Sequence, residues 1–248
     1  MPSSRKSRYL SCLSDSDKAY LERWFAPETL AELECIKSAI SDLPTKPTQN
    51  FYNVCLSNIL RDVSWQKKED LRSRREVTNL ATGETVTRFL DEATRSTKTV
   101  VGFLAEQGPV DARGHVVRQA DARRATAMLP KLIGKVDAVI TSPPYATALP
   151  YIDTDRLNLI YFGLLSRDSH RALDTRMIGN REVTKRLREE YWGYYEANKA
   201  LLPRQTRYLI NQIDQLNKTE SVGFRRQNLS ALLSKYCLLY TSPSPRDS

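Results

Sequence analysis

The fold of this chain is indicated by Val136-Asp137-Ala138-Val139-Ile140-Thr141-Ser142-Pro143-Pro144-Tyr145, an apolar, β-branched run that ends abruptly in two prolines. Such a run is typical of a buried strand in a parallel sheet. Proline has a fixed φ and no backbone N–H, so Pro143 and Pro144 cannot continue a sheet ladder. The sequence therefore predicts an α/β fold in which this strand ends in a rigid turn. Ligands of α/β sheets bind at that edge.

The four residues after the strand resemble a known catalytic motif. Ser-Pro-Pro-Tyr is similar to motif IV of the amino-DNA methyltransferases, (Asp/Asn/Ser)-Pro-Pro-(Tyr/Phe/Trp). These enzymes transfer a methyl group from S-adenosylmethionine to the exocyclic amine of cytosine (N4) or adenine (N6). The resemblance implies that the Ser142 hydroxyl and the Pro143 carbonyl accept hydrogen bonds from the amine. Pro144 would fix the direction of that carbonyl, and Tyr145 would stack on an extruded base.

The flanking sequence extends the resemblance over roughly residues 115–236. Gln119-Ala120-Asp121-Ala122-Arg123 is similar to the segment that ends a neighbouring strand in the family. There the aspartate contacts the adenine end of the cofactor, so Asp121 is the expected cofactor-binding residue. Residues 149–157 and 177–184 are also family-like. The implied fold is a partial Rossmann-like methyltransferase sheet.

Two features indicate a piece of a longer enzyme. The nine glycines of the chain include no Gly-x-Gly pair, so the Gly-rich cofactor loop that the family places after a strand is missing. Residues 237–248 look like translated sequencing adaptor and are expected to be non-native. We therefore expect three segments: a mainly helical, target-recognition-like region over 1–110, a partial catalytic domain over 111–236, and the tail. The isolated chain is expected to be inactive.

The first region shows helical periodicity. After Pro27, an apolar stripe recurs at helical spacing and consists of Leu30, Leu33, Ile36 and Ile40. A second stripe follows within 51–60, and a third helix is predicted over 84–106. A long helical stretch, interrupted near Pro203, is predicted over 183–217. Trp24, Phe25 and Trp65 are expected to be core residues rather than base-stacking residues.

Composition restricts the location and the partners. The chain has 38 basic and 29 acidic residues, a net charge of +9, which favours a polyanionic partner. No apolar run reaches transmembrane length, and no signal peptide is evident. Three scattered cysteines (the fourth, Cys237, lies in the tail) and only two histidines favour a reduced, cytoplasmic protein without a metal centre.

Three functions fit these observations. The first is a fragment of a site-specific DNA methyltransferase that flips its target base, with double-stranded DNA as substrate, a possible cognate restriction endonuclease as partner, and cytosine N4 preferred over adenine N6. The second is an amino-methyltransferase acting on RNA or on a protein glutamine. The third is a non-catalytic helical protein that binds nucleic acid, in which the Ser-Pro-Pro-Tyr sequence is incidental.

Overall fold

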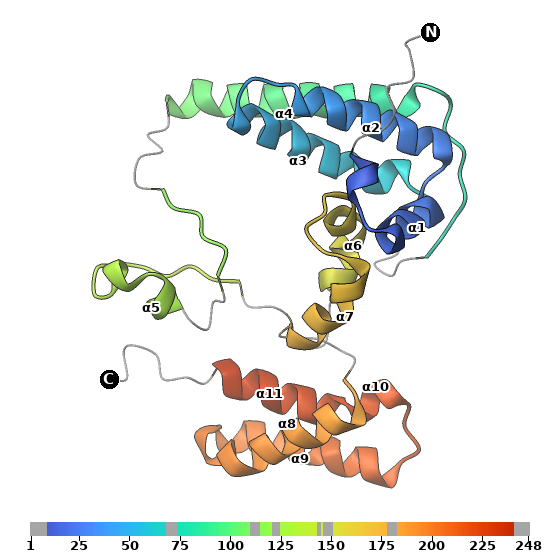
Figure 1. Cartoon of the computed structure of the whole chain (residues 1–248). Helices are drawn as coiled ribbons and strands as arrows, with labels where there is room; N and C mark the ends of the chain where they lie inside the picture. Colours follow the sequence, from blue (N-terminus) through green and yellow to red (C-terminus); the bar gives the residue numbers. More distant parts are fainter. Residues whose placement is uncertain are drawn as a thin grey trace. The chain divides into compact units, whose positions relative to one another are not determined.

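The structure is a computed structural model that describes residues 9–67, 74–109, 115–120, 125–142, 145, 151–177 and 183–240. Its elements are almost entirely helical (Figure 1). In chain order they are η1 (Leu10–Cys12), α1 (Asp15–Trp24), α2 (Pro27–Ser41), α3 (Lys46–Val63), α4 (Glu84–Gln107), α5 (Ala125–Met128), η3 (Pro130–Leu132), α6 (Tyr151–Tyr161), α7 (Arg167–Arg176), α8 (Lys185–Asn198), η4 (Lys199–Leu201), α9 (Arg204–Thr219), α10 (Phe224–Gln227) and α11 (Leu229–Tyr240).

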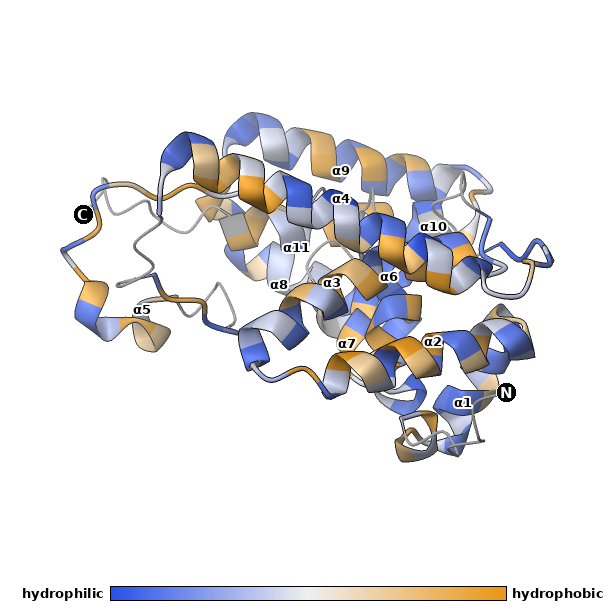
Figure 2. Cartoon of the chain, turned by 90° about the horizontal axis from the view of Figure 1, so that it is seen from above, coloured by the Kyte–Doolittle hydropathy of each residue, from blue (hydrophilic) through white to orange (hydrophobic). Residues whose placement is uncertain are grey.

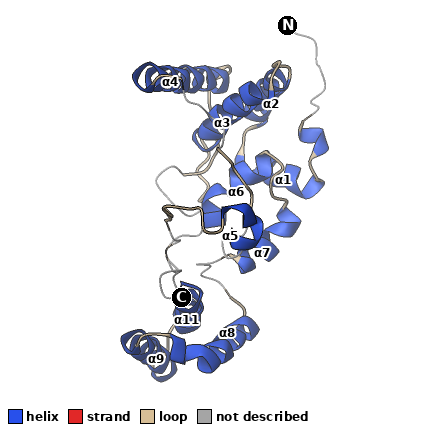
Figure 3. Cartoon of the chain, turned by 90° about the vertical axis from the view of Figure 1, so that its left-hand side faces the viewer, coloured by secondary structure: helices blue, strands red, loops and turns tan. Residues whose placement is uncertain are grey.

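The prediction of an α/β fold with a Rossmann-like sheet is wrong. Within the described ranges there is no strand, only an isolated antiparallel bridge between Gln66 and Arg75 (Figure 3). Residues 115–120 and 135–142, where strands were expected, form no ladder. A β-branched run becomes a strand only when another backbone pairs its N–H and C=O groups. These two segments have no such pairing.

Contacts divide the chain into two units, Met1–Thr94 with Pro144–Ser248, and Arg95–Pro143. In the first unit, α2 packs on α3, and α6 packs on both α1 and α3. Their apolar faces form one core, whose most deeply buried members are Leu21, Phe25, Leu33, Cys55, Leu56, Leu60, Ile160 and Tyr161. Trp24 and Phe25 are both buried, as predicted. Trp65 is only half-buried, and its indole N–H donates a 2.9 Å hydrogen bond to the backbone carbonyl of Thr78. The helical stripes seen in the sequence are therefore the surfaces that make this core.

Carboxylates fix the starts of two helices in this core. Glu32 of α2 accepts hydrogen bonds from the backbone N–H groups of Gly83 (2.6 Å) and Thr85 (3.1 Å) at the start of α4. Asp17 of α1 accepts one from the N–H of Arg167 (2.7 Å), the first residue of α7. The first N–H groups of a helix lack intrahelical partners, so both contacts satisfy groups that would otherwise need water.

A second apolar cluster lies in residues 183–240. Tyr195, Leu202 and Ile210 are buried there, and Leu233 and Leu238 pack against them. α11 contacts both α8 and α9. The predicted interruption near Pro203 is confirmed, because Pro203 precedes the first residue of α9. The last turn of α11 includes residues 237–240 of the suspected tail, and whether those residues are native stays a prediction.

The second unit carries apolar side chains that are mostly exposed. Val117 is 97% exposed, Val139 82% and Ile140 99%. The carboxyl half of α4 is also exposed, since Thr85, Phe89 and Ala93, the buried residues of this helix, all belong to its first half. Figure 2 shows apolar and polar residues alternating along α4. No described helix is long and apolar enough to span a bilayer.

Candidate functional site

The Ser-Pro-Pro-Tyr sequence begins on an exposed, non-helical segment. Residues 135–142 follow η3 without entering a helix, and Ser142 is exposed at the end of this segment. Its hydroxyl is therefore open to a ligand from solvent. Pro143 and Pro144 lie outside the described residues, so the predicted direction of the Pro143 carbonyl stays a prediction.

Tyr145 belongs to the other unit and is 66% exposed. An exposed phenol ring offers a flat apolar face on which a base can stack. Core tyrosines of this chain differ in exposure, since Tyr161 and Tyr195 are fully buried. The accessibility expected for a base-stacking residue is thus present at Tyr145.

The cofactor prediction falls on Asp121, which lies outside the described residues. The neighbouring segment 115–120 is described, and all six of its residues are exposed. Nucleoside-sized ligands are normally bound in concave sites that cover most of their surface. This exposed segment does not supply such surroundings by itself, and the assignment of Asp121 to the cofactor stays a prediction.

Sequence reasoning missed a charged cluster on α6 and α7. Arg156 pairs with Asp153 one turn earlier in α6 and donates a 2.9 Å hydrogen bond from Nε to Nε2 of His170 in α7. Because Nε2 accepts this hydrogen bond, the imidazole is neutral. Burial, with the charges of Arg156 and Arg167, lowers the pKa of His170 to about 4. The i, i+3 spacing of Asp153 and Arg156 was visible in the sequence, but nothing pointed to His170.

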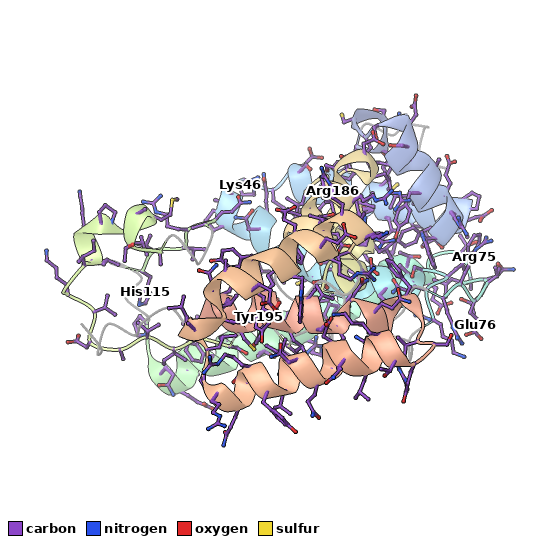
Figure 4. All side chains as sticks on the ribbon, turned by 90° about the horizontal axis from the view of Figure 1, so that it is seen from below. Lys46, Arg75, Glu76, His115, Arg186 and Tyr195 are labelled. Atoms are coloured by element: carbon purple, nitrogen blue, oxygen red, sulfur yellow. The ribbon has the colours of Figure 1, made fainter. Side chains whose placement is uncertain are left out.

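A second cluster surrounds Lys37 of α2. Its ammonium donates a 2.7 Å hydrogen bond to Oδ1 of Asn53 and lies 5.0 Å from the ring centroid of Tyr9 and 4.9 Å from that of Phe162. Burial and the charge of Lys46 lower the pKa of Lys37. Lys46, whose charge acts on Lys37, is the first residue of α3 and is labelled in Figure 4. The partners are scattered along the chain, so no sequence pattern could have revealed this cluster. It joins α2, α3 and the segment after α6.

In the part of the chain that the structure describes, no group of three or more His, Cys, Asp or Glu residues is placed to hold a metal ion. His115 is exposed and His170 is engaged by Arg156 (Figure 4 labels His115). Cys12 and Cys35 are exposed thiols and Cys55 is a buried one.

No family model, curated protein or solved structure matches this chain.

Proposed function

We propose that residues 142–145 receive the target base of a DNA amino-methyltransferase, with S-adenosylmethionine as methyl donor. The observation that carries this proposal is the exposure of Ser142 and of the Tyr145 ring at the two ends of the Ser-Pro-Pro-Tyr sequence. An exocyclic amine is a weak nucleophile because its lone pair is delocalised into the ring. The Ser142 hydroxyl would accept a hydrogen bond from that amine, and Tyr145 would hold the extruded base by stacking.

Double-stranded DNA is the proposed substrate because the chain carries a net charge of +9. Cytosine N4 is preferred over adenine N6, on the resemblance of motifs that begin with serine. A cognate restriction endonuclease and a cytoplasmic location belong to the same proposal. The described cysteines are thiols and not members of disulfides, which supports a reducing compartment.

Photo-cross-linking tests this proposal without requiring turnover. A duplex carrying an unpaired 5-iodocytosine would be irradiated with the full chain, and the adduct would be mapped by mass spectrometry. We expect the adduct at Tyr145, retained in Tyr145→Phe and lost in Tyr145→Ala. Tyr208→Ala is the matched control, because Tyr208 is 61% exposed but lies on α9.

Competition by unlabelled nucleic acids then identifies the base. A duplex with an unpaired cytosine should compete better than one with an unpaired adenine. If an RNA hairpin or a glutamine peptide competes more strongly than both duplexes, the result would favour an amino-methyltransferase that acts on RNA or on a protein glutamine. An undiminished adduct in Tyr145→Ala would contradict the proposed role of Tyr145.

A second candidate function is a non-catalytic helical protein that binds nucleic acid. It is favoured by one observation, the almost entirely helical structure of the described residues. In that case duplex binding would persist while no adduct forms at Tyr145, so the same cross-linking experiment separates the two candidates.

A further inference from the structure

Basic side chains gather where α8 begins beside α10. We define the α8–α10 basic surface as Lys185, Arg186 and Arg188 of α8 with Arg226 of α10. Lys185, Arg186 and Arg226 are exposed, and Arg188 is half-buried. Figure 4 shows the side chain of Arg186 on α8, together with that of Tyr195 on the same helix. Four cations therefore come from two elements that are about 40 residues apart in the chain.

Hydrogen bonds hold the two elements together. Nη1 of Arg188 donates to Oε1 of Gln227 (3.2 Å) and lies 3.5 Å from Oδ1 of Asn228. Asn228 is fully buried and donates from Nδ2 to the backbone carbonyl of Val183 (3.4 Å), just before α8. A buried amide with partners on both sides fixes the start of α8 against the end of α10. The basic surface is thus a defined feature of the fold.

Apart from Arg188, the cations of this surface do little to stabilise the helices on which they lie. The first turn of α8 has no acidic residue, and the helix dipole disfavours the cations Lys185 and Arg186 at that end. Lys185 lies 4.0 Å from Glu189, an exposed i, i+4 pair of little energetic value. Within the described ranges, Arg186 and Arg226 form no salt bridge. Their charges are therefore available to an anion from solution.

We propose that the α8–α10 basic surface binds the phosphate backbone of double-stranded DNA. Guanidinium groups pair well with phosphate oxygens, and a duplex presents closely spaced phosphates that can engage several cations at once. Such contacts position a duplex without reading its sequence. The inference rests on the proposed function only for the choice of DNA as the polyanion.

The test measures affinity of the full chain for a fluorescent duplex by anisotropy over a range of salt concentrations. In the double variant Arg186→Ala/Arg226→Ala, we expect affinity to fall about tenfold and the slope of log K against log salt to decrease by about 2. The control is Lys199→Ala/Lys218→Ala, which removes the same net charge. These lysines are already neutralised by Glu196 (2.6 Å) and Asp214 (2.5 Å), so affinity should change little.

Circular dichroism would verify that both variants keep their helices. Equal losses in the two double variants, or an unchanged Arg186→Ala/Arg226→Ala variant, would overturn the inference. So would binding to phosphatidylserine vesicles without binding to the duplex. A salt-dependent loss in the arginine variant without a Tyr145 adduct supports the surface while the methyltransferase proposal fails. A Tyr145 adduct together with unchanged duplex affinity in Arg186→Ala/Arg226→Ala would support the methyltransferase proposal and overturn the inferred basic surface.

Discussion

Tyr161 links segments that are far apart in the chain. Its hydroxyl donates a 3.1 Å hydrogen bond to the backbone carbonyl of Leu33, and its own backbone carbonyl accepts one from the hydroxyl of Tyr9. Tyr161 is fully buried, and burial raises its pKa far above the ordinary value for tyrosine. The phenol therefore stays protonated and serves as a donor in the folded core.

Substituting Tyr161 separates packing from hydrogen bonding. Tyr161→Phe keeps the ring and removes one hydrogen bond, so the free energy of unfolding should fall by about 1 kcal/mol. Tyr161→Ala also leaves a cavity and should cost about 3–5 kcal/mol. Urea unfolding followed by circular dichroism measures both. Tyr208→Phe, at an exposed position, should have almost no effect.

His170 gives the protein a pH-dependent stability. Its pKa is about 4 in the folded chain, below the value of about 6.5 expected when unfolded. The unfolded state thus binds the proton first as pH falls. The stabilisation from the neutral imidazole is complete above about pH 6.5 and is lost as the pH approaches 4. His170→Gln should reduce the stability difference between pH 7 and pH 5.

The control for this titration is the other histidine. His115 is exposed, so His115→Gln should leave the pH dependence as it is in the unmodified chain. Urea midpoints at the two pH values compare the variants directly. An unaltered pH dependence in His170→Gln would show that other groups cause it.

At the scale of elements, α4 depends on a carboxylate from α2. Glu32 accepts two backbone N–H groups at the start of α4, and Glu32→Ala leaves both without that partner. We expect a loss of about 1–2 kcal/mol, with faster hydrogen exchange at the amides of Gly83 and Thr85. Glu22→Ala removes an exposed carboxylate from α1 and should leave those amides protected as before. Uniform protection in both variants would refute the capping role.

Helices were predictable in this chain because their signals are local. Pro27 and the stripe that follows it correspond to α2, and the helix predicted over 84–106 corresponds to α4. A strand depends on a partner that can be far away in the sequence. Val139 and Ile140 have the composition of a strand but no paired backbone, which is why the predicted sheet was wrong.

For the candidate site, the sequence could indicate which residue types take part but not which side chains the fold brings together. Ser142 and Tyr145 could be chosen from the motif, and both are exposed in the structure. The cluster of Asp153, Arg156 and His170 depends on how α7 packs beside α6, which no spacing in the sequence specifies. Arg226 likewise meets α8 only through the fold.

For the whole molecule, the absence of a Gly-x-Gly sequence predicts weak cofactor binding. Calorimetry with S-adenosylmethionine should give a dissociation constant weaker than about 1 mM, because backbone N–H groups of a glycine loop are lacking. Any remaining heat of S-adenosylmethionine binding should be smaller still in the Asp121→Asn variant. Micromolar binding by this chain would show that another segment replaces the loop.

The exposed run from Val136 to Ile140 also affects how the protein behaves at high concentration. It combines β-branched residues with a single charge at Asp137, a composition that favours intermolecular strand pairing and aggregation. Pro143 and Pro144 cannot donate to a growing ladder, so they limit such pairing on the carboxyl side. The two prolines at the centre of the Ser-Pro-Pro-Tyr sequence would then also protect the chain's solubility.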